Sequence, residues 1–308
     1  MISSSSEQLK VKVPHLTEGD EDFRSQFISW DLGNLTLTDI GNYLKVKDTI
    51  LVPMASLEQH GPHLPLYTDT ITAVEVSRRV AEHIAVLHSP PIWMGYSPQH
   101  MHEPGLGRGT ITMRSQTLLA IMYDTARSLI HHGFNRIIFI NGHGSNIKVV
   151  DPVLRQLRYE TGALIGFVKP YMERYTGILK GLMENPPEET PGWHASELET
   201  SQDMAWNSDL VRMERASFTK AHIPESLPQS FGKKDGMPDV EFEGYTYFNF
   251  PMDHHEFIES GVIGNPLRAS KEKGEEAFKR LSEHTARGVL ELMNIKVNVH
   301  TREFINRV

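Results

Sequence analysis

The order of apolar segments predicts an α/β protein with a mostly parallel central sheet and helices on both faces. Short apolar runs of strand length alternate with longer stretches of helical spacing four times over residues 1–170. This alternation is typical of parallel strands that are joined by crossover helices. Several prolines and glycines interrupt it over residues 170–245, where short helices and long loops are expected.

Each expected element is identified from its own pattern. The strands are apolar runs that end in loop residues, and the helices carry apolar side chains three and four positions apart. Ser115 is placed to cap the second helix. The expected strands are residues 49–54, 92–96, 136–140 and 163–168. The expected helices are residues 70–87, 115–132, 147–161 and 270–294.

Composition limits the class of molecule and of partner. The chain has 308 residues, of which 39% are hydrophobic and 23% charged, so it can bury a full core. Residues 1–28 begin polar and Ser-rich and are expected to form an arm, followed by a single domain over 29–308. A net charge of −8 argues against nucleic acid and anionic membrane surfaces, so a small-molecule partner is expected.

The chain contains no cysteine, which restricts its chemistry. Disulfides, thiolate nucleophiles and iron–sulfur clusters are excluded, so any metal must be bound by His, Asp and Glu. No segment has the ~20 apolar residues of a membrane span, and the N-terminus lacks the pattern of a signal peptide. A cytoplasmic protein is therefore expected.

Polar clusters follow two of the expected strands. Glu58 and His60 follow the first strand and project to the same side of an extended backbone, and Asp69 can fold back toward them. His143 follows the third strand between two glycines. Parallel sheets bind ligands beyond the carboxyl ends of their strands, and imidazole with carboxylate suits zinc, manganese or iron. These positions predict a metal site, although each residue alone is also typical of an ordinary turn or surface position.

A third cluster covers residues 194–201, outside the strand and helix alternation. Ser196 and Glu199 have the Ser-x-x-Glu spacing of a capping box, which gives Glu199 a competing structural role. That role leaves His194 and Glu197 unexplained. Both could face a cleft from a helix N-terminus, where an anionic ligand or intermediate is favoured.

Together these motifs resemble the creatininase (creatinine amidohydrolase) family. The resemblance runs in order from about residue 29 to 295 and implies a three-layer α/β/α sandwich, a dinuclear metal centre, hydrolysis of carbon–nitrogen bonds in small, often cyclic amides, and often a hexamer. The matching motifs are LEQHGPHLP at 57–65 with Asp69, NGHGSN at 141–146, HASELETS at 194–201, GVIGNP at 261–266 and ASKEKG at 269–274.

Family roles can be carried over by motif onto residues of this chain. The resemblance implies two divalent metal ions, which could be zinc, manganese or iron. One ion would be held by Glu58, Asp69 and His143, and the other by His60, Asp69 and Glu197.

The sequence departs from creatininase itself beside this centre. Creatininase has a glutamate ligand where this chain has Ser145, whereas relatives with a Gly-His-Gly motif carry the residue that corresponds to Glu197; a role for Glu199 instead stays open. Residues 106–109 are also inserted beside the substrate loop, and Arg108 could bind a substrate carboxylate. Creatinine itself is therefore in doubt as the substrate. The expected substrate-binding residues are His100, Arg108, Ser145 and Trp193.

The resulting hypothesis is a metal-dependent hydrolase that opens a small amide by attack of a hydroxide bridging two cations. His194 and Glu199 are the expected catalytic residues, with His194 moving protons between water and the leaving group. One alternative is a lactonase that acts on a small carboxylated or unsaturated lactone. Another is a non-catalytic protein that binds a small ligand. A homo-oligomer is expected in each case.

Overall fold

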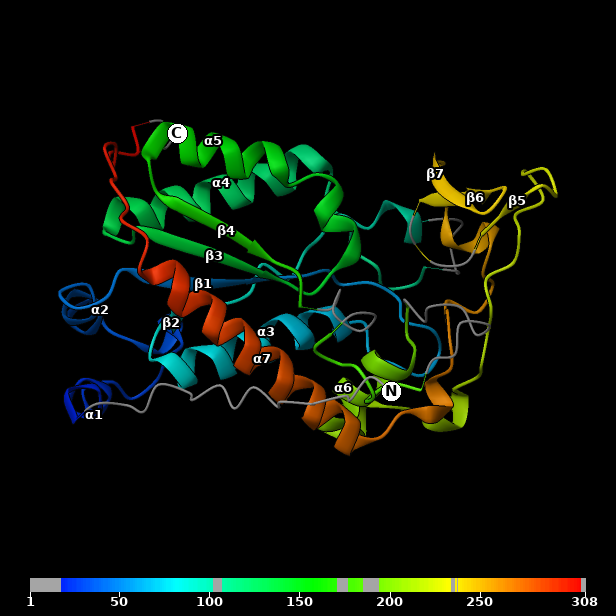
Figure 1. The fold of residues 1–308 in the computed structure, drawn as a ribbon, viewed down its shortest axis with the longest axis horizontal. Helices are drawn as coiled ribbons and strands as arrows, with labels where there is room; N and C mark the ends of the chain where they lie inside the picture. The colour runs from blue at the N-terminus through cyan, green and yellow to red at the C-terminus, as the bar shows by residue number, and fades with distance from the viewer. Residues whose placement is uncertain are drawn as a thin grey trace, which may run out of the picture.

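A four-stranded parallel sheet forms the centre of the molecule (Figure 1). The computed structural model describes residues 18–101, 107–170, 177–184, 194–233, 236 and 238–305. The strand order is β2-β1-β3-β4, and every neighbouring pair is parallel. The strands are β1 (Thr49–Met54), β2 (Leu87–His88), β3 (Arg136–Asn141) and β4 (Leu164–Val168).

The central strands bury side chains on both faces of the sheet. In β1, Ile50 and Val52 join one hydrophobic cluster, whereas Leu51 joins another on the opposite face. β3 alternates in the same way, with Ile137 in the first cluster and Ile138 in the second. Because successive side chains of a strand point to opposite faces, such a sheet needs an apolar helix layer on each side.

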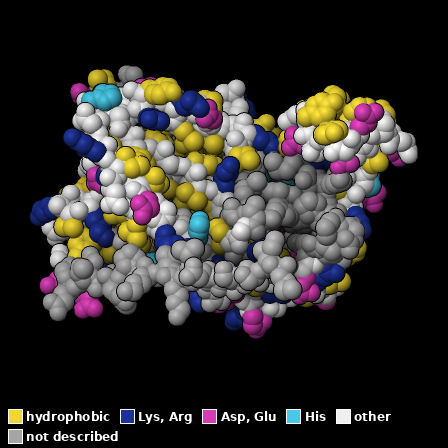
Figure 2. Space-filling view, in the orientation of Figure 1, with side chains coloured by type: hydrophobic (Ala, Val, Ile, Leu, Met, Phe, Trp, Pro, Cys, Tyr) yellow, Lys and Arg dark blue, Asp and Glu magenta, His cyan; other side chains and the backbone are white. Residues whose placement is uncertain are grey.

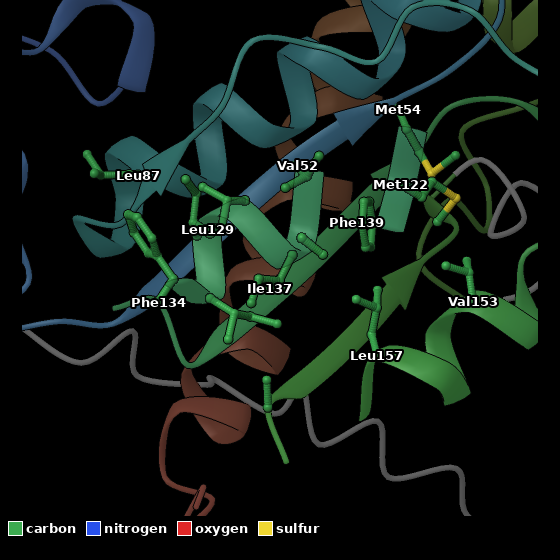
Figure 3. Close-up of a cluster of buried hydrophobic side chains, with 14 of the residues drawn as sticks. Val52, Met54, Leu87, Met122, Leu129, Phe134, Ile137, Phe139, Val153 and Leu157 are labelled. Atoms are coloured by element: carbon green, nitrogen blue, oxygen red, sulfur yellow. The ribbon is translucent and has the colours of Figure 1, made fainter. Parts of the chain in front are cut away.

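Helices supply those two layers (Figure 1). α4 (Ser115–His132) and α5 (Asp151–Thr161) cover one face, and α3 (Thr68–Ile84) and α7 (Lys271–Met293) cover the other. α6 (Glu197–Asn207) packs against both α7 and α3. The predicted three-layer α/β/α sandwich with a mostly parallel sheet is confirmed. Figure 3 shows the first cluster, with Met122, Leu129, Val153 and Leu157 packed beside Ile137 and Phe139.

The prediction of a strand at residues 92–96 is wrong. Ile92 and Gly95 make only isolated bridges, to Met54 and Thr112, and the strand beside β1 is instead the short β2. Pro90 and Pro91 lie between them. Proline has no N–H to donate to a neighbouring strand, so regular pairing stops after β2.

Two parts of the fold were not expected from the sequence. The first is at the N-terminal side, where Phe23 is buried and its ring lies 6.1 Å from that of Tyr43, so part of the expected arm contributes to the core. The division at residue 28 stays a prediction. The second is a small antiparallel sheet at one end of the molecule. Its strands are β5 (Phe231–Gly232), β6 (Asp239–Phe242) and β7 (Tyr245–Asn249).

Hydrophobic side chains are gathered on the surface of this small sheet (Figure 2). Tyr245 and Tyr247 are 70% and 67% exposed. No helix among the described residues is long and apolar enough to cross a membrane. The remaining helices are α1 (Glu18–Ser25) and α2 (Leu37–Tyr43), with short 3₁₀ helices at η1 (Leu32–Asn34), η2 (Pro98–His100), η3 (Gly144–Lys148), η6 (Ser208–Leu210), η7 (Met213–Arg215), η8 (His254–Glu256) and η9 (Pro266–Arg268).

Candidate metal centre

The carboxyl ends of β1 and β3 bring the predicted ligands together. Met54 and Asn141 are register partners, so the two strands end at the same level of the sheet. The loop after β3 also passes very close to the start of α3. A Cβ atom added to Gly142 would lie 2.1 Å from the carbonyl oxygen of Asp69, so this approach requires glycine. The two loops and the start of α3 therefore meet beyond one edge of the sheet.

Glu58, Asp69 and His143 form the first group of potential ligands. All three are buried, and Nδ1 of His143 lies 2.9 Å from Oδ2 of Asp69 and 3.3 Å from Oε1 of Glu58. Nε2 of His143 lies 3.0 Å from the carbonyl oxygen of Tyr96 and can donate to it. That hydrogen bond leaves the lone pair on Nδ1, facing the two carboxylates.

His60, Asp69 and Glu199 form the second group. Nε2 of His60 lies 3.4 Å from Oδ1 of Asp69 and 3.8 Å from Oε2 of Glu199. Nδ1 of His60 faces the carbonyl oxygen of Glu58 at 3.2 Å, so Nε2 carries the lone pair on the ligand side. Asp69 thus belongs to both groups and presents a different carboxylate oxygen to each.

The chemistry of these residues fits divalent cations. Among the described residues, Oε2 of Glu58 is buried without a hydrogen-bond partner, and Nε2 of His60 and Oδ2 of Asp69 are buried with no partner beyond the ion-pair contacts given above. Buried polar atoms are normally hydrogen-bonded, so unpartnered lone pairs that converge indicate a missing positive group. In each group the ligand atoms lie within 4.8 Å of one another. Imidazole and carboxylate ligands without sulfur suit zinc, manganese or iron.

The electrostatics of the centre also favour cations. Burial alone would lower the pKa of His60 and His143, but the neighbouring carboxylates of Asp69 and Glu58 outweigh it and raise both pKa values to about 10. The pKa of Glu58 lies well below its usual range: burial opposes ionisation, but His143 and His100 outweigh it. A metal ion that binds here replaces protons as the positive partner of the carboxylates.

Glu197, expected to complete the second metal site, has other partners in the structure. Its fully buried carboxylate accepts a hydrogen bond from Nζ of Lys273 at 2.7 Å and from the backbone N–H of Glu184 at 2.9 Å. Its charge is therefore neutralised away from the centre. Glu199 takes the position beside His60 instead, and its Oε2 also accepts the backbone N–H of Ala195 at 2.5 Å.

His194, the residue predicted to be catalytic, lies beside both groups. Its Nε2 lies 2.7 Å from the carbonyl oxygen of Gln59, and its Nδ1 lies 3.9 Å from Oε1 of Glu58. Its ring stacks on that of His60 with the centroids 4.2 Å apart. Burial, together with His60 and His100, holds the pKa of His194 well below its usual value, so the ring is neutral.

His254 is a site residue that sequence reasoning missed. It is buried, and its ring makes edge contacts with those of His100 and His194, at centroid distances of 4.1 and 4.9 Å. The run Asp253-His254-His255-Glu256 was the available signal, because two histidines between two acids are typical of sites as well as of surface turns. Its distance along the chain from the other motifs hid the connection.

The expected substrate-binding residues have different surroundings. His100 is buried, and its Nε2 lies 3.3 Å from Oε1 of Glu58. With Gln59, Gln99 and His254 it lines a small cleft. Gln99 also lines a larger neighbouring cleft.

The other three expected residues are not equivalent. Oγ of Ser145 accepts a hydrogen bond from Nε2 of Gln99 at 2.9 Å, which places it beside the junction of the two clefts. Arg108 is exposed and lines neither cleft, so the structure does not support its role in binding a carboxylate. Trp193 lies outside the described residues.

A sandwich with a histidine and carboxylate centre beyond its parallel strands defines a class, the metal-dependent hydrolases. The family model described as creatinine amidohydrolase matches residues 33–289. Creatinine amidohydrolase from Pseudomonas putida is 30% identical over 79% of this chain and 90% of its own length. The mycofactocin precursor peptide peptidase of Mycolicibacterium smegmatis is 37% identical over 75% of this chain and 80% of its own length. The chain belongs to the creatininase family.

Solved structures agree with this assignment. A creatininase of the Zn–Zn type has a TM-score of 0.67 and 27% identity, covering 87% of this chain and 99% of its own. A manganese form of creatininase has a TM-score of 0.66 with the same identity and covers 87% and 100%. The predicted metal-dependent hydrolase is therefore confirmed as a class, and its solved relatives include a Zn–Zn form and a manganese form.

Proposed function

We propose that the protein hydrolyses a small cyclic amide at a centre of two cations. Glu58, Asp69 and His143 hold one ion, and His60, Asp69 and Glu199 hold the other. The observation that carries this proposal is the shared Asp69, whose Oδ1 and Oδ2 face different imidazoles at 3.4 and 2.9 Å. Cations held there supply positive charge that polarises a carbonyl group and lowers the pKa of water.

His194 is the proposed proton carrier. Its Nε2 hydrogen is committed to the carbonyl oxygen of Gln59, so the neutral ring presents the lone pair of Nδ1 to the centre. Nδ1 can take a proton from the attacking water and return it to the leaving nitrogen. Stacking on His60 and His100 holds the imidazole plane in place and keeps bulk water away.

A peptide is the second candidate substrate. The larger cleft, which shares Gln99 with the small one, has room for chain beyond the scissile amide. Apolar side chains such as Tyr96, Met252 and Phe257 contribute to its walls. The similarity to the mycofactocin precursor peptide peptidase supports the same reading.

Matched substrates test the proposal. The zinc-loaded or manganese-loaded protein is assayed with a lactam, the lactone of equal ring size, and short peptides, with Asp69→Asn as the inactive control. We expect hydrolysis of an amide. Faster opening of the lactone would support the lactonase alternative, and binding without turnover of any of them would support a non-catalytic protein.

We also propose that the protein is a homo-oligomer such as a hexamer, located in the cytoplasm, with no nucleic-acid partner. The family resemblance supports the assembly, and the net charge of −8 argues against nucleic acid. Light scattering tests the assembly, and cell fractionation tests the location.

A further inference from the structure

Asp203 is a buried acid that the proposed mechanism does not use. It lies on α6, one helical turn after Glu199, and is 1% exposed. Its Oδ2 lies 2.6 Å from Oγ1 of Thr68, the first residue of α3 and the neighbour of Asp69. The same Thr68 hydroxyl lies 2.8 Å from the carbonyl oxygen of Pro65. Asp203 therefore belongs to a short chain of polar contacts next to the centre.

The hydrogens in this chain of contacts can be counted. A threonine hydroxyl has a single hydrogen to donate, and a backbone carbonyl oxygen can only accept. If Asp203 were ionised, Thr68 would face two acceptors with one hydrogen. With Asp203 ionised, the hydrogen of Thr68 serves Asp203 or is shared with Pro65, whereas with Asp203 protonated each of the two short contacts has a hydrogen of its own.

The other oxygen of Asp203 indicates the same state. Among the described residues, Oδ1 is buried and has no hydrogen-bond partner. A buried oxygen without a hydrogen-bond partner costs more free energy on an ionised carboxylate than on the carbonyl group of a neutral acid. Burial raises the pKa of Asp203 to about 8 and outweighs the hydrogen bond with Thr68 and the charge of His60, which both lower it.

We propose that Asp203 is a neutral carboxylic acid that positions the second cation site. Its hydrogen bond to Thr68 joins α6, which carries Glu199, to the first turn of α3, which carries Asp69. The pair Thr72 and Gln202 joins the same two helices one turn further on, at 3.3 Å. Asp203 acts through Thr68 and contacts no substrate, and its role rests on the proposed ligands Asp69 and Glu199.

Two substitutions at Asp203 separate a neutral donor from a charged group. In Asp203→Asn the amide N–H can still donate to Thr68, whereas Asp203→Leu removes the donor. By zinc titration calorimetry, we expect Asp203→Asn to bind the second equivalent within about threefold of wild type and Asp203→Leu to bind it about 10–100-fold more weakly. The infrared spectrum of the metal-free wild type should show the carbonyl band of a protonated acid that Asp203→Asn lacks.

Thr68→Val provides a second way to break the contact if Asp203→Leu does not fold. Thr68→Val should weaken binding of the second zinc equivalent to the same extent as Asp203→Leu. Adding Asp203→Asn to Thr68→Val should cause no further loss of affinity. If Asp203→Asn no longer binds the second zinc equivalent, or if wild type lacks the infrared band, the assignment of Asp203 as a neutral acid is wrong. If both Asp203→Leu and Thr68→Val bind the second zinc equivalent with wild-type affinity, Asp203 does not position the second cation site. If wild type binds a single equivalent, the two-cation function fails, whereas the infrared band still decides the state of Asp203.

Discussion

At the scale of single residues, Glu197 and Glu199 show how position on a helix decides the role of a carboxylate. They lie two positions apart on α6, so their side chains leave the helix in different directions. The carboxylate of Glu197 forms an ion pair with Lys273, and that of Glu199 lies beside the ring of His60. The same residue type therefore serves packing in one case and the proposed metal centre in the other.

This difference can be tested with a matched pair of variants. Glu199→Gln should lose one of the two cations, because an amide is a poor ligand, while Glu197→Gln should keep both. Glu197→Gln should instead lower the free energy of unfolding by about 1–3 kcal/mol, since Lys273 loses a charged partner. Metal analysis and thermal unfolding measure the two effects. A Glu197→Gln protein that retains stability and loses metal would reverse the assignment.

A second pair separates metal binding from proton transfer. Asp69→Asn should lose both cations and activity together, because Asp69 faces both ligand groups. His194→Ala should keep both cations and lower kcat by about 10²–10⁴-fold, the usual contribution of a general acid or base. Metal content and steady-state kinetics are compared on the same preparations. A fully active His194→Ala protein would show that another group moves the proton.

At the scale of secondary-structure elements, the contact between the β3 loop and α3 determines where His143 and Asp69 meet. Gly142→Ala places a methyl group against the carbonyl oxygen of Asp69, so it should lower the free energy of unfolding by about 1–3 kcal/mol and weaken metal binding. Gly144→Ala is the control, because the added Cβ has no heavy atom within 4 Å. Equal behaviour of the two variants in chemical unfolding and metal titration would contradict this account.

The ion pairs that link α3 to α7 make the stability of the protein depend on pH. Glu75 is buried on α3 and pairs with Arg78 and Arg79, and Arg79 continues to Glu275 on α7. Burial opposes ionisation of Glu75, but the two arginines outweigh it and lower its pKa below the ordinary 4.5. Its contribution to stability is therefore present above that value and is lost as the pH falls through the lowered pKa.

Glu75→Gln measures this contribution. We expect a loss of about 1–2 kcal/mol at neutral pH, a modest figure because both arginines are partly exposed, and little difference from wild type in acid. Urea unfolding at a series of pH values gives the comparison. A difference that grows as the pH falls would have the wrong sign for this ion pair.

At the scale of the whole molecule, the proposed cations would add cross-links between elements that one hydrophobic cluster already brings together through Leu51, Ile71, Ile138 and Leu198. The ligands come from the loops after β1 and β3 and from the helices α3 and α6. Removing metal with a chelator should lower Tm, because at a hundredfold excess over Kd a bound ion stabilises the folded state by about 3 kcal/mol. Calorimetry on Asp69→Asn is the control, and a chelator should leave its Tm unchanged.

Much of the fold could be predicted from the sequence. The first strand and the helix over residues 115–132 have the predicted boundaries, because an apolar run and a regular helical spacing are local signals. Tertiary contacts outweighed the local pattern elsewhere. The apolar residues 92–96 did not form a strand, and the short strands β5 and β6 lie within residues 170–245, where prolines and glycines predicted loops.

The sequence by itself determined the class of this protein and its first candidate ligands. Glu58, His60 and His143 follow strands that run parallel and end at one edge, so local motifs were enough to bring them together. Only the tertiary structure decided between Glu197 and Glu199 and showed His254 and Asp203 near the centre. Their partners lie far away in sequence, and the packing of α6 on α3 and α7 sets which side chains meet.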